Sequence, residues 1–435
     1  MHGSLPGAPQ TAAPSFREAA GVWAKIGLLS FGGPAAQIAL MHRILVEEKR
    51  WMAEPLYLSA LSFCMLLPGP EAMQLATYAG WRLHGTKGGL TAGLLFVLPG
   101  AFVVLALSAI YVAFGNLAPV VALFLGIKSA VLVIVIEALL RIGRRALKGR
   151  QHWIIAGAAF LGIFFLALPF PLIVLLAAAW GFFQAVRSPS DVPAGIERPR
   201  LAGQTLRTTA LWLAIWFVPL GVLAYGFGFD HVLAQLAAFF SRLAVVTFGG
   251  AYAVLAYMSQ DVVVRHHWLE AGQMMDGLGL AETTPGPLIL VTEFVGFVAA
   301  WRNAGGGSWA MALLGAAVAL WATFAPCFLW IFAGAPYIEW LTKQARLKGA
   351  LDAITAAVVG VILNLAVWFA LHVFFAEVDA VRHGPLIVWT PDPASLDWRV
   401  VVLAAISAGL LLYRHWNIVA VLAVAAAGGM ALSLV

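Results

Sequence analysis

Long apolar stretches dominate this sequence and leave few folds open to it. Thirteen of them follow one another between residues 16 and 435. A helix needs about 20 apolar residues to cross a bilayer, whereas a strand of a membrane barrel needs only about 10 alternating ones. Charged residues make up 11% of the chain, compared with about 25% in soluble domains. The sequence therefore predicts an all-α polytopic membrane protein. It excludes a soluble enzyme, a disordered protein and a nucleic-acid binder, despite the net charge of +6.

The sequence offers no site for a metal or a redox cofactor. It contains two cysteines, Cys64 and Cys327, and both lie inside apolar segments without the spacing of metal ligands. We therefore expect no disulfide framework, no bound metal and no cofactor. The first 15 residues lack the charged leader and the apolar core of a signal peptide, so residues 1–15 are predicted to be a disordered tail.

Two of the apolar segments contain residues that stop a helix. The motifs Phe31-Gly32-Gly33-Pro34 and Leu67-Pro68-Gly69-Pro70 combine flexible glycines with prolines that lack an N–H group. Inside a membrane such a break survives only where it faces protein or water. The residues predicted to break helices here and in the second half of the chain are Pro34, Pro68, Pro70, Pro285 and Pro287.

The same two breaks recur 217 residues further on, which predicts an internal duplication. Phe248-Gly249-Gly250 repeats the first break and Pro285-Gly286-Pro287 repeats the second. We divide the chain into a tail (1–15), an N-terminal transporter repeat (16–186), a cytoplasmic linker with one inverting transmembrane helix (187–230) and a C-terminal transporter repeat (231–435).

The basic residues predict that the two repeats have opposite orientations. Residues 141–150 carry five basic side chains and no acid, whereas the corresponding segment 377–399 carries four acids and two arginines. Because short cytoplasmic loops are enriched in Lys and Arg, we expect the 141–150 and 343–348 loops inside and the 377–399 loop outside. This is the inverted-topology repeat of many secondary transporters. The sequence is compatible with two numbers of membrane crossings: thirteen, or about nine if the broken segments dip into the membrane and return.

The breaks suit an anionic cargo. A helix that begins at a break presents free N–H groups and the positive end of its dipole, and both attract an anion at the midplane. The alternatives are a simple packing kink and, for the polar side chains, hydrogen bonds between helices. The predicted cargo-binding residues at the breaks and beside them are Ser30, Gly32, Gly33, Gln37, Gly69, Gln74, Thr247, Gly249, Gly250, Thr284 and Gly286.

Charged residues at membrane depth lead to two further hypotheses. Lys25 and Arg242 each lie six residues before a break and match in the repeat, so we predict that they supply two positive charges to a doubly charged cargo. The alternative is that each side chain snorkels to an interface. Glu71 and Glu282 stand beside the Pro-Gly-Pro breaks, and we predict that they couple transport to protons. The alternative for both is a cap on a helix N-terminus.

A compound set of motifs resembles one known family. The set consists of Ser30-Phe-Gly-Gly-Pro34, His42-Arg43, Leu66-Leu-Pro-Gly-Pro-Glu-Ala72, Gln74-Leu-Ala-Thr-Tyr78, Trp81, His84-Gly85-Thr86 and Thr284-Pro-Gly-Pro287. It is similar to the chromate ion transporter family in its long two-domain form, from about residue 16 to the C-terminus. The resemblance implies a multi-pass inner-membrane protein that exports chromate and confers chromate resistance, with sulfate as the look-alike oxyanion. The second repeat departs from the motifs with Ala251 in place of Pro34 and Leu288 in place of Glu71.

The membrane potential favours export of such an ion. Each charge that crosses is worth about 2.3 kcal/mol per 100 mV, so an interior-negative potential drives a dianion outward by about 4.6 kcal/mol per 100 mV. The chain has no Gly-x-x-x-x-Gly-Lys-Ser/Thr loop for a nucleotide. The leading hypothesis is therefore a secondary chromate exporter, driven by the potential or by a proton gradient. Uptake of sulfate or another oxyanion is the rival within transport, and an intramembrane enzyme or a channel-like scaffold is the rival outside it. The expected partners are the oxyanion and membrane lipid, and a homodimer is one open alternative for the oligomeric state.

Overall fold

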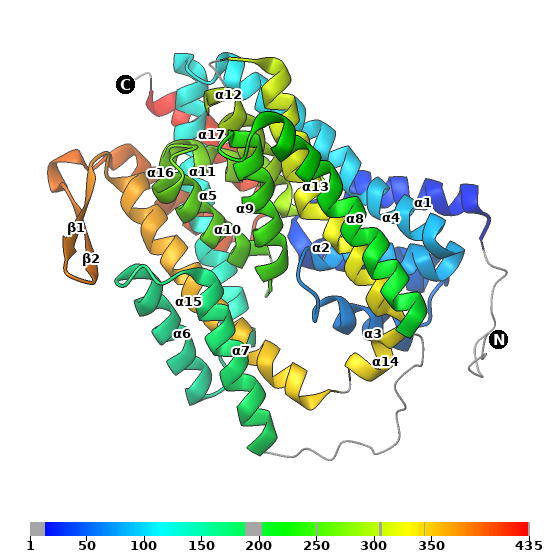
Figure 1. The fold of residues 1–435 in the computed structure, drawn as a ribbon. Helices are drawn as coiled ribbons and strands as arrows, with labels where there is room; N and C mark the ends of the chain where they lie inside the picture. Colours follow the sequence, from blue (N-terminus) through cyan, green and yellow to red (C-terminus); the bar gives the residue numbers. More distant parts are fainter. Residues whose placement is uncertain (1–13, 188–201, 249–250, 304–306, 343, 434–435) are drawn as a thin grey trace.

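The computed structural model describes residues 14–187, 202–248, 251–303, 307–342 and 344–433. Most of the predicted tail and linker, together with Gly249 and Gly250, lie outside these ranges. The described chain is built almost entirely of helices (Figure 1). Five of them are long and apolar enough to cross a membrane, namely those that span Glu71–Phe114, Ala118–Ala146, Gly203–Phe227, Trp309–Tyr337 and Ala345–Phe374. The prediction of an all-α polytopic membrane protein is therefore confirmed.

The helices follow the predicted duplication. The N-terminal repeat contains α1 (Phe16–Leu29), α2 (Gly33–His42), α3 (Glu54–Cys64), α4 (Glu71–Phe114), α5 (Ala118–Ala146), α6 (Arg150–Phe164) and α7 (Phe170–Arg187). The C-terminal repeat contains α9 (Val232–Val246), α10 (Ala251–Gln260), α11 (Ala271–Thr283), α12 (Val291–Asn303), α13 (Trp309–Gly334), α14 (Ile338–Leu341), α15 (Ala345–Phe374), α16 (Trp398–Ala408) and α17 (Ile418–Leu432). Between them lies α8 (Ala202–Phe227). Even a short π-helical stretch recurs, at Arg43–Glu48 and Asp261–Arg265.

Helix α4 is a hairpin of two antiparallel halves. Its backbone leaves the helical region at His84 and Gly85, and the halves touch where Gly80 meets Gly88. A Cβ atom on either of these glycines would lie within 2.4 Å of the carbonyl oxygen of the other. The pair α12 and α13 has the same form in the second repeat, where Gly296 and Gly315 meet in the same way.

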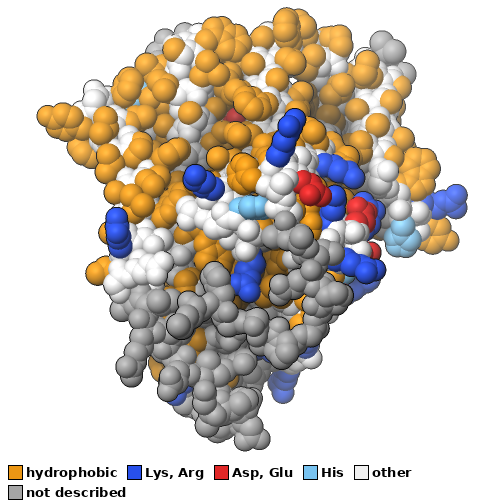
Figure 2. Space-filling view, turned by 90° about the vertical axis from the view of Figure 1, so that its right-hand side faces the viewer, with side chains coloured by type: hydrophobic (Ala, Val, Ile, Leu, Met, Phe, Trp, Pro, Cys, Tyr) orange, Lys and Arg blue, Asp and Glu red, His pale blue; other side chains and the backbone are white. Residues whose placement is uncertain are grey.

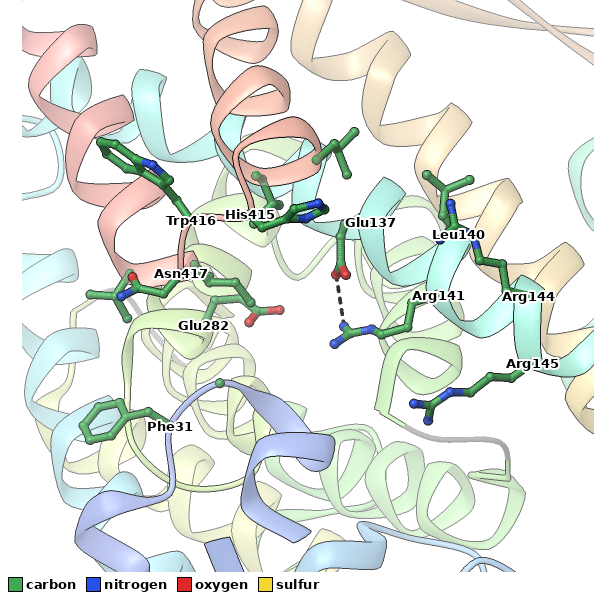
Figure 3. A pocket seen from close by; sticks show the side chains of 15 residues that line it. Phe31, Glu137, Leu140, Arg141, Arg144, Arg145, Glu282, His415, Trp416 and Asn417 are labelled. Atoms are coloured by element: carbon green, nitrogen blue, oxygen red, sulfur yellow. Dashed lines mark ion pairs between the residues drawn. The ribbon is translucent and has the colours of Figure 1, made fainter. Parts of the chain in front are cut away.

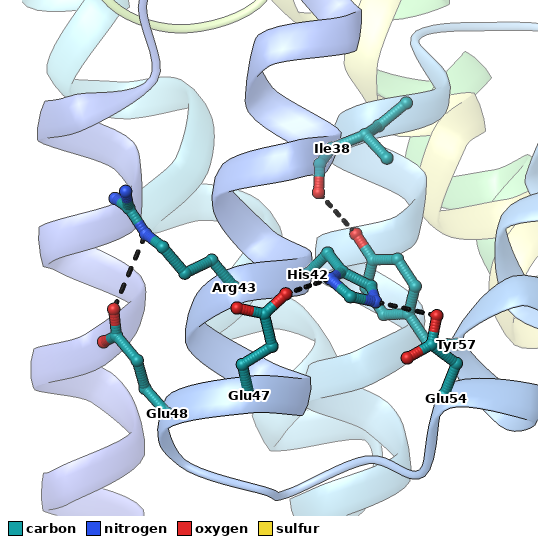
Figure 4. A network of polar contacts seen from close by, with 7 residues as sticks. All are labelled: Ile38, His42, Arg43, Glu47, Glu48, Glu54 and Tyr57. Carbon is teal, nitrogen blue, oxygen red and sulfur yellow. Dashed lines mark hydrogen bonds and ion pairs between the residues drawn. The ribbon is translucent and has the colours of Figure 1, made fainter.

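The first broken segment of the first repeat returns to the side from which it came. The second ends close to the same place, because a ring nitrogen of His84 is 2.8 Å from the Pro14 carbonyl oxygen just before α1. Lys49, which follows α2, forms an ion pair of 2.9 Å with Glu18 near the start of α1. His42 at the end of α2 contacts both Glu47 at 3.0 Å and Glu54 at 3.2 Å, which joins the first broken segment to the start of α3 (Figure 4). A chain that crossed the membrane between α1 and Lys49 would separate these charges. The geometry therefore favours the count of about nine crossings.

The surface is divided as expected for a protein in lipid. Figure 2 shows one face on which hydrophobic side chains cover the upper part, while charged and histidine side chains gather in a band below them. Such a band suits the polar boundary of a bilayer.

The two repeats exchange their last helices. Helices α16 and α17 of the second repeat pack on α5 of the first, and α6 and α7 of the first repeat pack on α15 of the second. Glycines make both contacts close: a Cβ on Gly126 of α5 would lie 1.8 Å from the Ala425 oxygen of α17, and one on Gly181 of α7 would lie 2.1 Å from the Gly349 oxygen of α15. The repeats are therefore intertwined.

A small hairpin interrupts the helical pattern in the segment 377–399, for which the sequence analysis expected only a loop. Strands β1 (Val378–His383) and β2 (Leu386–Pro391) pair antiparallel, with Val381 opposite Val388. The Ile387 N–H donates to the Phe165 carbonyl at 2.7 Å, which fixes the hairpin to the end of α6.

Candidate functional site

The breaks of the two repeats meet and are joined by paired hydrogen bonds. The Gly69 N–H donates to the Thr247 carbonyl at 2.9 Å, and the Gly286 N–H donates to the Ser30 carbonyl at 2.8 Å. Both donors and both acceptors are related by the spacing of 217 residues. The second break of each repeat is therefore fastened to the first break of the other, as a pseudo-two-fold axis through the site requires.

Glycine is needed at these positions for its backbone freedom. Gly32, Gly69 and Gly286 have φ angles of 82°, 116° and 92°, in the left-handed region that disfavours other residues. A Cβ on Gly69 would also lie 2.8 Å from the Gln74 amide nitrogen. The second Pro-Gly-Pro break rests on α4 at Gly100, where a Cβ would lie 2.1 Å from the Pro285 oxygen.

Two buried glutamine side chains donate hydrogen bonds to backbone carbonyl groups at the breaks. The Gln37 amide nitrogen donates to the Gly286 carbonyl at 2.6 Å and to the Ser30 carbonyl at 3.3 Å. The Gln74 amide nitrogen donates to the Pro68 carbonyl at 2.7 Å. Their side-chain oxygens find no partner among the described residues. In this conformation the amides hold the broken backbone together and do not point free donors at a cargo.

The hydroxyl groups predicted to bind cargo are also engaged. Ser30 and Thr247 donate to the carbonyls four residues earlier in their own helices, and Thr284 donates to the Ala281 carbonyl at 3.1 Å. The N–H groups of Gly69 and Gly286 are likewise used between the repeats. The structure brings these described residues together and gives them contacts that stabilise the breaks.

A cavity of about 820 Å³ opens beside the first break (Figure 3). Phe31 and Gly32 of the break and Glu282 of α11 line the cavity, together with residues of α5. Its charged and polar lining residues are Glu137, Arg141, Arg144, Arg145, Glu282, His415, Trp416 and Asn417. The cavity therefore connects the basic end of α5 with the break at Gly32.

The arginines that line the cavity differ in whether they form an ion pair with another described residue. Arg141 forms an ion pair of 3.1 Å with Glu137, one helical turn earlier on α5. Arg144 and Arg145 are exposed and form no ion pair with another described residue. Glu282 accepts a hydrogen bond of 2.9 Å from the Tyr252 hydroxyl. The lining thus combines a net positive rim with one carboxylate next to the break.

The other charged residues that were predicted to act in transport do not line this cavity. Lys25 and Arg242 are exposed on α1 and α9, and neither lines this cavity. Their exposure agrees with the alternative in which both side chains reach an interface. Glu71 forms the first turn of α4 and does not line the cavity either.

The sequence analysis missed the residues that give the cavity its charge. It used Arg141, Arg144 and Arg145 only to orient the chain, and His415 and Asn417 drew no attention. A signal was present, because the arginines continue α5 past its apolar part on the side of Glu137. What brings them to the break is the fold of α11, α16 and α17, which local sequence does not reveal.

A separate, largely buried ion pair lies nearer the start of α5. The Lys128 amine is 3.4 Å from the Asp276 carboxylate of α11, and the Tyr111 hydroxyl of α4 donates to the same carboxylate at 2.8 Å. Gly272 makes room for the lysine, because a Cβ there would lie 3.0 Å from its amine. Lys128 is about 20 Å along the helix from Arg141, so this pair joins the repeats away from the cavity.

Comparison with known proteins identifies close relatives. The family model described as chromate transporter matches residues 17–182 and 234–430. A chromate transport protein of Pseudomonas aeruginosa is 32% identical over 412 residues, which cover 90% of this chain and 91% of that protein. A chromate transport protein of Cupriavidus metallidurans is 30% identical over 80% of each chain.

A shorter relative matches only part of the chain. The uncharacterized transporter YwrB of Bacillus subtilis is 30% identical over 39% of this chain but 87% of its own length. No solved structure matches this chain. The two regions of the family match coincide with the two repeats, and together they include all four helix breaks. This chain belongs to the chromate transporter family.

Proposed function

We propose that this protein exports chromate across the inner membrane and thereby confers chromate resistance. The observation that carries the proposal is the cavity that joins Arg141, Arg144 and Arg145 to the helix break at Gly32. The relatives named chromate transport proteins support the choice of cargo.

The rim of the cavity suits the capture of a dianion. Two of its arginines have no ion-pair partner in the described chain, and their positive charge raises the local concentration of an anion. If the basic end of α5 faces the cytoplasm, as the loop charges predict, the anion enters from inside. The interior-negative potential then drives it outward by about 4.6 kcal/mol per 100 mV.

The break at Gly32 is where the cargo reaches the midplane. Helix α2 begins at Gly33, so its first N–H groups and the positive end of its dipole lie beside the cavity. In our proposal the N–H groups of Gly69 and Gly286 become available when the bonds between the repeats open. Exchange of these bonds for bonds to the cargo would let the site face the other side of the membrane.

Proton coupling is assigned to the two carboxylates beside the breaks. Glu282 lines the same cavity as Arg141, so a proton on Glu282 and a bound anion would lie in one cavity. Glu71 begins α4 next to the first Pro-Gly-Pro break, where the second repeat has Leu288. Because the fold accepts leucine at the equivalent place, we assign Glu71 a role in coupling.

Transport into inside-out membrane vesicles tests the proposal. Chromate should accumulate when the vesicle interior is made positive, and vesicles without the protein provide the blank. Arg141→Gln should lower the rate at low chromate concentration at least tenfold, whereas Lys148→Gln removes a nearby charge outside the cavity lining and should change it little. Accumulation of sulfate without chromate would reject chromate as the cargo.

A further inference from the structure

A second cavity lies between α8 and α9, away from the breaks. Its volume is about 620 Å³, within the usual range for ligand pockets. Phe217, Leu220, Gly221 and Ala224 of α8 form one wall, and residues of α9 form the other. The pocket therefore has apolar walls on the helix that links the two repeats.

The polar part of this pocket is small and positively charged. Arg242 lines it and forms no ion pair with any described residue. His266 lines it as well, and its ring is stacked on Trp268 at 4.3 Å between centroids. The Ser241 hydroxyl completes this edge: the residue is 8% exposed, and its oxygen has no hydrogen-bond partner in the described chain.

The apolar walls continue onto a surface that faces lipid. Only 17% of the apolar window of α8 is buried inside the protein. Phe217 is 48% exposed and Phe229, at the edge of the pocket, is 78% exposed. A small hydrophilic anion would satisfy the arginine but would leave these apolar walls unmatched.

We propose that this pocket binds the headgroup of an anionic phospholipid. The phosphate contacts Arg242, with His266 and the Ser241 hydroxyl as further donors, and an acyl chain lies along α8 past Phe217. This occupant gives the unpaired guanidinium a counter-charge and covers the apolar walls with hydrocarbon. It also explains why Arg242 faces outward although its helix is apolar.

Native mass spectrometry of the full chain in detergent tests the inference. Phosphatidylglycerol should bind at least tenfold more tightly than phosphatidylcholine, which has the same chains but no net charge. Arg242→Gln should abolish this preference. Arg265→Gln removes a neighbouring basic residue that does not line the pocket, and should retain it.

A second variant covers the case in which Arg242→Gln does not fold. A Cβ on Gly221 would meet no atom within 4 Å, so Gly221→Leu is compatible with the fold but fills the apolar half of the pocket. It should weaken phosphatidylglycerol binding at least fivefold.

Four results would overturn the inference. They are equal binding of the two lipids, an unchanged preference in Arg242→Gln, unchanged affinity in Gly221→Leu, and displacement of the lipid by millimolar inorganic phosphate. The last result would identify a site for small anions. Chromate transport does not enter these measurements, so they leave the proposed function untouched.

Discussion

At the scale of single residues, we propose that Glu282 is the side chain that links a proton to the cargo. It lies beside the helix break, lines the same cavity as Arg141, and accepts a hydrogen bond from Tyr252. Two charges of opposite sign in one cavity affect each other strongly, because the surrounding protein screens them less than water does.

We predict that Glu282→Gln weakens the pH dependence of chromate transport and slows transport at least tenfold. The amide keeps the shape of the side chain and can still accept the bond from Tyr252, so the folded yield should be unchanged. The measurement is the transport rate in vesicles across a range of pH. Tyr252→Phe is the comparison, since it removes the hydrogen bond but keeps the carboxylate, and should retain a pH dependence. An unaltered pH profile in Glu282→Gln would remove this residue from the coupling step.

Glu282, which lines the cavity, was among the residues predicted from the sequence, but the arginines that line it were not. Glu282 could be found because it stands next to a repeated proline motif, and Gly32 because it interrupts an apolar helix. Lys25 and Arg242 fitted the repeat equally well, yet both side chains point to exposed surfaces. Spacing along the chain shows which turn of a helix carries a charge, but the direction in which that turn faces depends on helices from the other repeat.

At the scale of elements, the glycine breaks are the most demanding part of the backbone. Gly69 combines a positive φ angle, a hydrogen bond to the opposite repeat and close contact with Gln74. The prolines and glycines of these motifs predicted where helices end, because local chemistry alone decides it. The antiparallel turn of α4 at His84 and Gly85 has no proline, but it coincides with the boundary between two of the thirteen apolar stretches, 54–84 and 87–114.

Gly69→Ala should destabilise the protein by about 1–3 kcal/mol through backbone strain alone, with a further loss from the overlap with Gln74. Transport should fall with it, because the bond to Thr247 is disturbed. The melting temperature of the purified protein measures the first effect. Gly157→Ala in α6, where a Cβ would meet no atom within 4 Å, is the control and should not destabilise. Equal melting temperatures for the two variants would contradict the need for glycine at the break.

The buried pair between α5 and α11 gives a second prediction at this scale. Lys128→Met leaves the Asp276 carboxylate buried with only Tyr111 as a partner, so we expect a loss of about 3–5 kcal/mol. The double variant Lys128→Met with Asp276→Leu should recover most of this loss, because no unpaired charge remains. A double-mutant cycle from denaturation curves measures the coupling. Additive effects of the two changes would show that the pair contributes nothing as a pair.

At the scale of the whole molecule, the opposite orientation of the repeats decides which way the cavity opens. The basic end of α5 and the hairpin of β1 and β2 should lie on opposite sides of the membrane, the first inside and the second outside. The duplication, its inversion and the extra helix α8 were all visible in the sequence, because repeats and loop charges are global patterns. The exchange of helices between the repeats was not visible, because the sequence of one repeat does not indicate which helices of the other repeat it packs against.

Cysteine labelling in intact cells checks this arrangement. In a background with Cys64→Ser and Cys327→Ser, a membrane-impermeant maleimide should label Thr390→Cys at once. It should label Lys148→Cys only after the membrane is permeabilised. Both positions are exposed, so access to the reagent depends on the side of the membrane alone. The reverse pattern would place the cavity mouth outside and would contradict the proposed entry of the anion from the cytoplasm.

Because the repeats exchange helices, two helices that pack together are synthesised at different times. Helix α5 packs on α17 through Gly126 and Ala425, which are about 300 residues apart in the chain. At a synthesis rate of about 5–20 residues per second, the second helix leaves the ribosome about 15–60 s after the first. During that interval the glycine face of α5 has only lipid or the insertion machinery as a neighbour. The N-terminal repeat therefore completes its packing only after α17, the last helix of the C-terminal repeat, has been synthesised. In a chain that is truncated before α17, helix α5 lacks this packing partner.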